Sequence, residues 1–155
     1  MHTLFIDADA CPVTREAITA ARAVGWPVVV VANSSQAGAL ERLAARKGVE
    51  VVQVSQGADA ADFAIVERLS AGDVVVTQDI GLAAMVLGRG AHAVSPRGRR
   101  FHQVSIDAEL LVRHEEAKLR RSGGRHGGPS AFTDEDRDHF SDTLEWIIRD
   151  VSREG

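Results

Sequence analysis

Short runs of β-branched residues alternate with alanine-rich stretches along the first 95 residues. The runs predict strands near residues 3–6, 28–32, 49–54, 73–77 and 91–94. The stretches between them predict helices near residues 12–24, 37–47, 60–70 and 80–88. The run from Val28 to Val31 is apolar at every position, which is typical of a strand buried on both faces of a parallel sheet. The alternation therefore predicts an α/β fold made of consecutive right-handed βαβ units.

Residues 96–155 follow a different pattern. We expect a polar helix over 104–121, a glycine-rich loop over 122–130, and a last helix with an apolar face made of Phe140, Leu144, Ile147 and Ile148. Thr133 and Asp136 have the spacing of an N-terminal helix cap. The last helix is expected to pack on the domain or on a second subunit, so a homo-oligomer formed through it is one prediction.

The bulk composition indicates an ordinary globular protein. A chain of 155 residues with 45% hydrophobic and 26% charged residues predicts one domain over 1–155, with the α/β core in 1–95. No apolar stretch approaches the roughly 18 residues that span a membrane, and the N-terminus lacks a signal-peptide pattern. Cys11 is the one cysteine, which excludes an internal disulfide and a cysteine-based zinc cluster. These features favour the cytoplasm and no membrane partner.

The net charge of −4 is distributed unevenly. Residues 96–126 hold eight Lys or Arg and four Asp or Glu, whereas both flanking segments are net acidic. A basic segment beside an acidic site would hold a phosphate backbone, which makes RNA a candidate partner. Alternatively, the segment is a solvated helix face followed by a basic loop.

Two of the predicted strands end in carboxylates. Asp7 and Asp9 follow the first strand, and Asp79 follows the fourth. Open α/β sheets bind ligands just beyond the carboxyl ends of their strands. Because Mg²⁺ and Mn²⁺ prefer oxygen ligands, these acids predict a divalent-metal site. Asp9 is either a ligand in that site or a cap for the helix that follows.

A second acidic pair, Asp59 and Asp62, lies at the start of a predicted helix. The spacing of three puts both carboxylates on neighbouring turns of one helix face. Negative charge is also favourable at a helix start without any function. Both are therefore candidate metal ligands, and the pattern does not choose between them.

Other polar residues at the same predicted edge are candidates for substrate binding. Asn33 and Ser35 follow the second strand and would bind substrate or cap the next helix. Thr77 would orient a carboxylate or a water, and Arg97 would meet a phosphate or lie in an exposed turn. Asp73 begins the fourth strand at the opposite edge, so we expect it to be structural.

Cys11 is a weaker candidate. A helix N-terminus lowers a thiol pKa, but the neighbouring carboxylates would raise the pKa of Cys11. The six histidines show no ligand spacing. A small buried thiol is therefore expected rather than a nucleophile.

Taken together, these motifs resemble the YaiI/YqxD family of uncharacterised bacterial proteins over nearly the whole chain. The resemblance rests on Asp7-Ala-Asp-Ala-Cys-Pro12, Val31-Ala-Asn33, Asp59-x-x-Asp62-x-x-Ile65-Val66, Gly72-Asp73, Thr77-x-Asp79-Ile80, Pro96-Arg97-Gly98, and Ser122-Gly-Gly to Gly127-Gly-Pro129. That family is regarded as related to PIN-domain nucleases. The resemblance implies a three-layer α/β/α PIN-like fold with a central parallel sheet ordered 3-2-1-4-5, plus C-terminal helices.

The implied strand order makes the first and fourth strands neighbours, so Asp7 and Asp79 would lie side by side at the switch point. PIN nucleases also use an acid at the helix before the fourth strand, which corresponds to Asp59 or Asp62. They commonly use a further acid near the helix after the second strand. Glu41 is the one acid there and does not match the pattern, so Asp9 would take that place.

The predicted function is divalent-metal-dependent hydrolysis of phosphodiester bonds, with RNA as the expected substrate. Asp7, Asp62 and Asp79 are the predicted catalytic residues, and Mg²⁺ or Mn²⁺ is the predicted cofactor. Arg99 and Arg100, with Arg97, would steer the phosphate backbone.

Two alternatives stay open. Asp-x-Asp after an apolar strand also opens haloacid-dehalogenase-like phosphatases, in which Asp7 would be the nucleophile. Those enzymes need a downstream lysine, and neither Lys47 nor Lys118 has a fitting context. The other alternative is a non-catalytic module that binds a metal or an RNA end.

Overall fold

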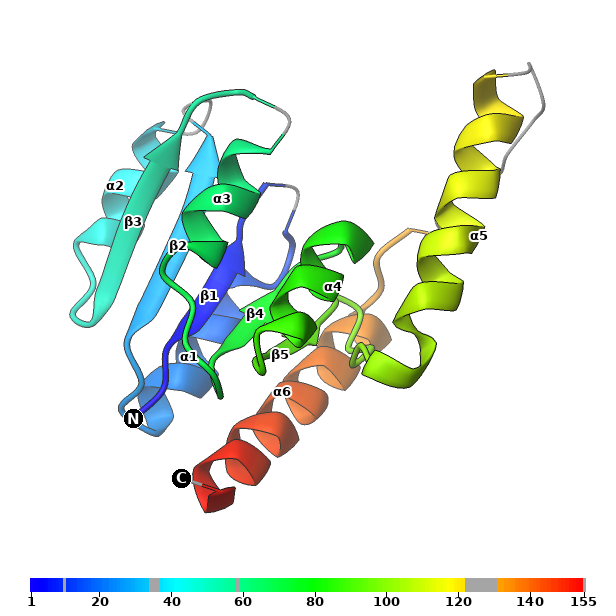
Figure 1. Cartoon of the computed structure of the whole chain (residues 1–155). Coiled ribbons are helices and arrows are strands. Elements are labelled where there is room, and N and C mark those ends of the chain that lie inside the picture. The colour runs from blue at the N-terminus through cyan, green and yellow to red at the C-terminus, as the bar shows by residue number, and fades with distance from the viewer. Residues whose placement is uncertain (10, 34–36, 58, 122–130, 155) are drawn as a thin grey trace.

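The computed structural model describes residues 1–9, 11–33, 37–57, 59–121 and 131–154. These residues contain five strands and six helices (Figure 1). The strands are β1 (Leu4–Asp7), β2 (Val28–Asn33), β3 (Val49–Val54), β4 (Val74–Val76) and β5 (His92–Val94). The helices are α1 (Thr14–Ala23), α2 (Ala37–Ala44), α3 (Ala60–Val66), α4 (Ile80–Gly88), α5 (Gln103–Arg121) and α6 (Asp134–Glu154).

The strands form one sheet in which every pairing is parallel. Their order is β3-β2-β1-β4-β5, which confirms the order that the family resemblance implies. β1 lies in the centre, with Ile6 paired to Val30 of β2 on one side and to Val76 of β4 on the other. Chain order reverses at β1, so a crevice opens at the carboxyl ends of β1 and β4.

Successive strand residues face opposite layers of the molecule. Leu4 and Ile6 belong to the core between the sheet and helices α1 and α6, whereas Phe5 belongs to the core beneath α3 and α4 (Figure 1). All three side chains are almost completely buried. Burial on both faces explains the continuous apolar runs, and the predicted α/β/α layering is confirmed.

The apolar face of α6 packs within its own chain. Its buried residues join the same core as the inner side of α1, and they are Phe140, Leu144, Ile147, Ile148 and Val151. Of the two predicted arrangements, the structure shows packing on the domain. The face proposed for a homo-oligomer is thus already covered.

Three predicted helices are shorter than expected. Helix α1 begins at Thr14 rather than at residue 12, because fully buried Val13 occupies its N-cap. Helix α2 ends at Ala44 and helix α3 ends at Val66, each a few residues before the predicted end. In α2 and α3 a turn that leads toward the next strand takes the place of the last predicted helical turn.

Asp73 holds the turn between α3 and β4. Its buried carboxylate accepts hydrogen bonds from the backbone N of Thr3 and of Ser70, both at 2.9 Å. These bonds lie at the amino edge of the sheet, far from the crevice. The prediction that Asp73 is structural is confirmed.

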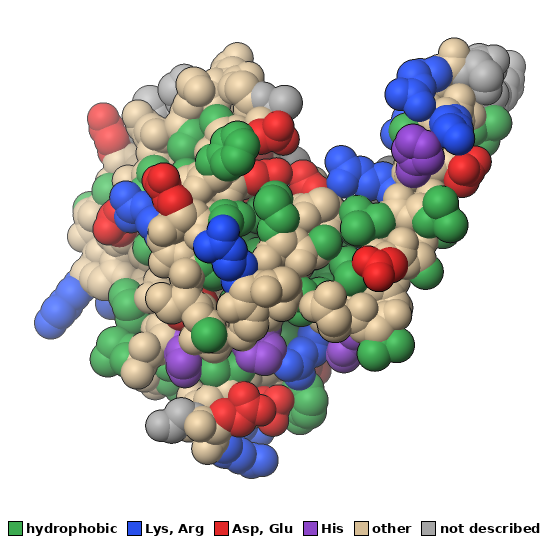
Figure 2. Space-filling model, in the orientation of Figure 1, with side chains coloured by type: hydrophobic (Ala, Val, Ile, Leu, Met, Phe, Trp, Pro, Cys, Tyr) green, Lys and Arg blue, Asp and Glu red, His purple; other side chains and the backbone are tan. Residues whose placement is uncertain are grey.

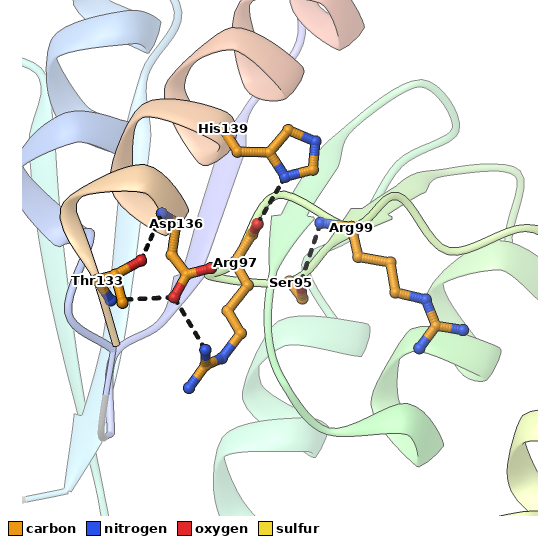
Figure 3. A network of polar contacts seen from close by, with 6 residues as sticks. All are labelled: Ser95, Arg97, Arg99, Thr133, Asp136 and His139. Atoms are coloured by element: carbon orange, nitrogen blue, oxygen red, sulfur yellow. Dashed lines mark hydrogen bonds and ion pairs between the residues drawn. The ribbon is translucent and has the colours of Figure 1, made fainter. Parts of the chain in front are cut away.

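A polar network anchors the start of α6 on the loop that follows β5 (Figure 3). Arg97 Nη1 lies 2.9 Å from Asp136 Oδ2, which also accepts a hydrogen bond from Thr133 N at 3.0 Å. Asp136 N donates in turn to Thr133 Oγ1 at 3.1 Å, so the predicted cap is confirmed. His139 Nδ1 donates to the Arg97 carbonyl at 2.9 Å, which fixes the loop to the first turns of the helix.

Gly98 makes this contact possible. It has a φ of +89°, and a Cβ at this position would lie 2.8 Å from the carbonyl carbon of His139 and from the backbone N of Phe140. A side chain would therefore push α6 away from the loop.

We predict that Gly98→Ala destabilises the chain more than Gly25→Ala does. Gly25 has a φ of +75° and open space around it, so alanine there costs about 1–2 kcal/mol for the backbone conformation alone. At Gly98 the overlap with backbone atoms adds roughly 1–3 kcal/mol. Urea unfolding of both variants measures the difference, and equal losses would contradict the proposed packing role.

Candidate functional site

Four carboxylates line one cleft at the carboxyl edge of the sheet. Asp7, Asp9, Asp62 and Asp79 border a hollow of about 400 Å³, together with Asn33 and residues 54–57. A second hollow of about 440 Å³ adjoins it and shares all of these acids except Asp62. Figure 2 shows acidic side chains gathered at the top of the body, on the side that faces the projecting α5.

The secondary structure brings these acids together from distant parts of the sequence. Asp7 is the last residue of β1, Asp79 is the N-cap of α4, and Asp62 lies in the first turn of α3. Strand carboxyl ends and helix N-termini meet at this edge, and helix N-termini stabilise negative charge. The predicted convergence of Asp7 and Asp79 is present in the structure.

Thr77 connects Asp7 with the backbone of Asp79 through its side-chain hydroxyl. Its hydroxyl donates to Asp7 Oδ2 at 2.9 Å and accepts from the backbone N of Asp79 at 3.0 Å. Thr77 is 1% exposed. Of its predicted roles, orienting a carboxylate is the one that these hydrogen bonds support, and direct contact with a substrate stays a prediction.

Asp79 is held on two sides. Its Oδ1 accepts hydrogen bonds from the backbone N of Gly81 at 2.8 Å and of Leu82 at 3.2 Å. Arg113 of α5 reaches the same oxygen, with Nη1 at 3.3 Å. Sequence reasoning missed Arg113, and its location in the basic segment 96–126 was the one signal that pointed toward it.

Burial and the nearness of other carboxylates raise the pKa values of Asp62 and Asp7. Burial, followed by the negative charges of Asp79, Asp7 and Asp59, raises the pKa of Asp62 from 3.8 to about 6. Burial also raises the pKa of Asp7, with Asp9 and Asp79 adding to the rise and the Thr77 hydrogen bond opposing it. A bound cation would relieve both penalties, because it would stabilise the charged forms.

The structure separates Asp62 from Asp59. Asp62 lines the cleft, whereas Asp59 occupies the N-cap position of α3 outside the cleft lining and makes no side-chain cap hydrogen bond. Asp59 therefore acts on the site through its charge and does not line it. Glu41 lines a different hollow beside β3, so Asp9 is the additional acid at this edge.

Asp9 is placed beside the end of β2. Its Oδ1 accepts a hydrogen bond from the backbone N of Asn33 at 3.3 Å. The N-cap of α1 is Val13, so the alternative in which Asp9 caps that helix was wrong. Asn33 lines the cleft as expected, and Ser35 lies outside the described residues.

The three arginines after β5 are engaged elsewhere. Arg97 pairs with Asp136, and Arg99 forms an ion pair with Glu109 of α5. Arg100 lies beside His92 and over the ring of Trp146. The basic side chain that reaches the carboxylates is Arg113 instead.

Cys11 is a partly buried thiol. It packs against the core under α1 and α6, and burial raises its pKa, with the charges of Asp7 and Glu16 adding to the rise. These shifts disfavour the thiolate that nucleophilic catalysis requires.

Within the described residues, no three His, Cys, Asp or Glu side chains stand close enough together to form a ready-made metal site. The acids of the cleft surround a common space instead. No helix in the same residues has the length and apolar character to cross a membrane.

Comparison with known proteins identifies the family. The model of the "Uncharacterized BCR, YaiI/YqxD family" matches residues 5–150. The chain belongs to the YaiI/YqxD family. Two of its relatives are named "UPF0178 protein". The protein of Xanthomonas campestris pv. campestris is 47% identical over 97% of this chain and 92% of its own length. That of Bacillus velezensis is 40% identical over 94% and 84%.

One solved structure is a more distant match to this YaiI/YqxD-family chain. The match to a crystal structure of Rae1 (YacP) from Bacillus subtilis covers 99% of each of the two chains, with 19% sequence identity and a TM-score of 0.39. A likeness of this size carries no information on activity.

We predict that Asp62→Asn stabilises the metal-free protein at pH 7. The pKa of Asp62 is about 6 in the folded chain and ordinarily 3.8. Between these two pH values the folded state therefore binds the Asp62 proton more tightly than the unfolded state does. The free energy of unfolding therefore falls as pH rises through this window, and the substitution removes that loss.

Thermal melts with a chelator present should show Asp62→Asn melting a few degrees above the wild type at pH 7. The gain should disappear below about pH 3, where Asp62 is protonated in both states. Asp142→Asn on the exposed side of α6 is the matched control and should show no such pH dependence. A gain that is the same at both pH values would contradict the assignment.

Proposed function

We propose that the chain is a divalent-metal-dependent phosphodiester hydrolase that acts on RNA, with Mg²⁺ or Mn²⁺ as its cofactor. The observation that supports this most is the convergence of Asp7, Asp9, Asp62 and Asp79 on one cleft, where burial together with the neighbouring carboxylates raises the pKa of Asp62 to about 6. The family's relationship to PIN-domain nucleases supports the same reaction class.

The donor set fits a hard divalent cation. Asp7, Asp62 and Asp79 would hold the ion through carboxylate oxygens, with Asp9 as a fourth acid at the same edge. A bound metal ion would supply an activated water and neutralise charge on the phosphate as the bond breaks. A shared cation would also draw these side chains closer together.

Residues around the acids keep them oriented before a substrate binds. The Thr77 hydroxyl fixes the carboxylate of Asp7, and the amides of Gly81 and Leu82 fix that of Asp79. Carboxylates held in this way lose less conformational freedom when they bind an ion or a substrate. Asn33 at the rim of the cleft would contact the substrate.

Arg113 is the proposed phosphate-binding residue. Its guanidinium reaches Asp79 Oδ1 at 3.3 Å while its side chain is 52% exposed. An exposed guanidinium can form paired hydrogen bonds with a phosphate beside the carboxylates. The nucleic-acid backbone would thereby be placed next to the acidic cluster despite the cluster's negative charge.

The phosphatase alternative has less support from the structure. Lys118 pairs with Glu115 on α5, and Lys47 is exposed after α2, so the described lining of the cleft contains neither lysine. A non-catalytic binding module would bind a metal or RNA at the same site without cleaving RNA. Measuring metal binding and RNA cleavage on the same variants distinguishes this module from a hydrolase.

Asp7→Asn and Asp79→Asn should each abolish metal binding and cleavage together. With the wild type, Mn²⁺ at a hundred times its dissociation constant should stabilise the fold by about 2.7 kcal/mol. Each variant should lose that stabilisation, and its rate of cleaving a labelled single-stranded RNA should drop at least about a hundredfold.

Asp142→Asn serves as the control and should match the wild type in both assays. Stabilisation by Mn²⁺ without RNA cleavage by the wild type would favour the binding module. Unchanged cleavage by both variants would overturn the proposed active site.

Arg113→Ala should separate catalysis from metal binding. Removing a phosphate ligand is expected to lower RNA cleavage by about ten- to a hundredfold. Affinity for Mn²⁺, measured by calorimetry, should stay equal or rise, because the cation that competes for Asp79 is gone. A loss of Mn²⁺ affinity would instead assign Arg113 a structural role.

A further inference from the structure

Helix α5 exposes four large apolar side chains to solvent, and the proposed role of the cleft gives no reason for their exposure. Val104 is 98% exposed, Leu111 61%, Val112 57% and Leu119 44%. Ile106 is the one buried residue of this helix, which is described along its whole length. Figures 1 and 2 show α5 projecting from the body with hydrophobic side chains along it.

These side chains form one stripe. At 3.6 residues per turn, Val104, Leu111, Val112 and Leu119 share the side of α5 that also carries Ala108. Ile106 and Arg113 lie on the opposite side, where they contact the body. An amphipathic helix of 19 residues, about 28 Å long, normally gains its stability by burying its apolar stripe.

We propose that a second copy of this chain covers the stripe, with the two α5 helices packed antiparallel across a two-fold axis. The axis would pass between Leu111 and Val112. Val104 would then lie opposite the partner's Leu119, so that apolar residues meet along the whole stripe. Such an interface is isologous, with the same surface on both copies.

Charge on the flank of the stripe sets the antiparallel orientation. Asp107 and Lys118 lie on the same flank, near opposite ends of the helix. An antiparallel arrangement brings this flank of the two helices together, so Asp107 lies within about 3 Å, along the helix axis, of the level of the partner's Lys118, and the symmetry repeats this pair. A parallel arrangement would turn this flank of the two helices to opposite sides of the interface, where Asp107 and Lys118 could not pair. Glu115, which interrupts the stripe, already pairs with Lys118 at 3.7 Å.

A nucleic acid fits this stripe less well than a second copy does. Apart from Glu115 the stripe is apolar, while Arg113 and, seven residues later, Arg120 lie on the side of α5 that faces the body. A phosphate backbone would therefore meet the side of α5 that carries Arg113. The apolar side is left for a protein, apart from its edge at Ala108 and Val112, which lines a hollow against the body. Dimerisation would also steady the helix that carries Arg113 to Asp79.

Sedimentation velocity on the full chain tests the dimer from about 1 to about 100 µM. We expect the wild type to dimerise in this range, and Leu111→Glu to weaken dimerisation by more than about a hundredfold because it buries a charge. Met85→Glu makes the same kind of change at an exposed residue of α4 and should leave the dimer intact. Circular dichroism would confirm that both variants keep their helices.

Charge exchange tests the orientation. Asp107→Lys should weaken the dimer at least about tenfold, and the double variant Asp107→Lys/Lys118→Asp should restore it. A wild type that stays monomeric throughout, or a double variant that is not rescued, overturns the proposal. If the protein is monomeric and Leu111→Glu reduces its affinity for single-stranded RNA, the stripe belongs to nucleic-acid binding instead.

Discussion

The parallel pairing of β1 with β4 is the contact on which the rest of the site depends. Leu4 to Ile6 run beside Val74 to Val76 in the middle of the sheet, and both strands are buried on their two faces. This pairing brings together two chain segments separated by about 70 residues. It places Asp7 beside Thr77, whose hydroxyl then links Asp7 to the backbone of Asp79.

The same arrangement that builds the cleft also makes it electrostatically costly. Carboxylates from β1, α3 and α4 share one hollow, and their repulsion adds to burial in raising the proton affinity of Asp62. The structure offsets part of this cost with the amides at the start of α4 and with the guanidinium of Arg113. We propose that a bound cation relieves the remaining repulsion, as the proposed metal-dependent hydrolysis requires.

The two C-terminal helices have opposite relations to the body. Helix α6 buries an entire apolar face against the sheet and α1, and the network around Arg97 and Asp136 holds its first turn. Helix α5 buries Ile106 at its base and extends outward (Figure 1). Helix α6 completes the core, while α5 contributes Arg113 to the cleft and leaves an apolar stripe exposed, on which we propose that a second copy packs.

Local pattern alone determined the type of the elements and the fold class. Apolar runs such as Val28 to Val31 report burial on both faces, which only a sheet covered by two helical layers provides. Strand β3 was predicted with its observed bounds, and the acids at strand ends followed from the same pattern. Strand order itself came from the family resemblance. Helix ends were less accurate, because they depend on turns such as the one that buries Val13.

Tertiary structure decided which of the candidate residues meet. Asp62 rather than Asp59 lines the cleft because α3 begins at Ala60 and turns that side inward, a rotation that spacing cannot reveal. Arg113 lies 34 residues beyond Asp79, on a helix whose direction no local pattern encodes. The positions of strand ends follow from residue-by-residue hydrophobicity, whereas contacts between helices depend on how distant segments pack.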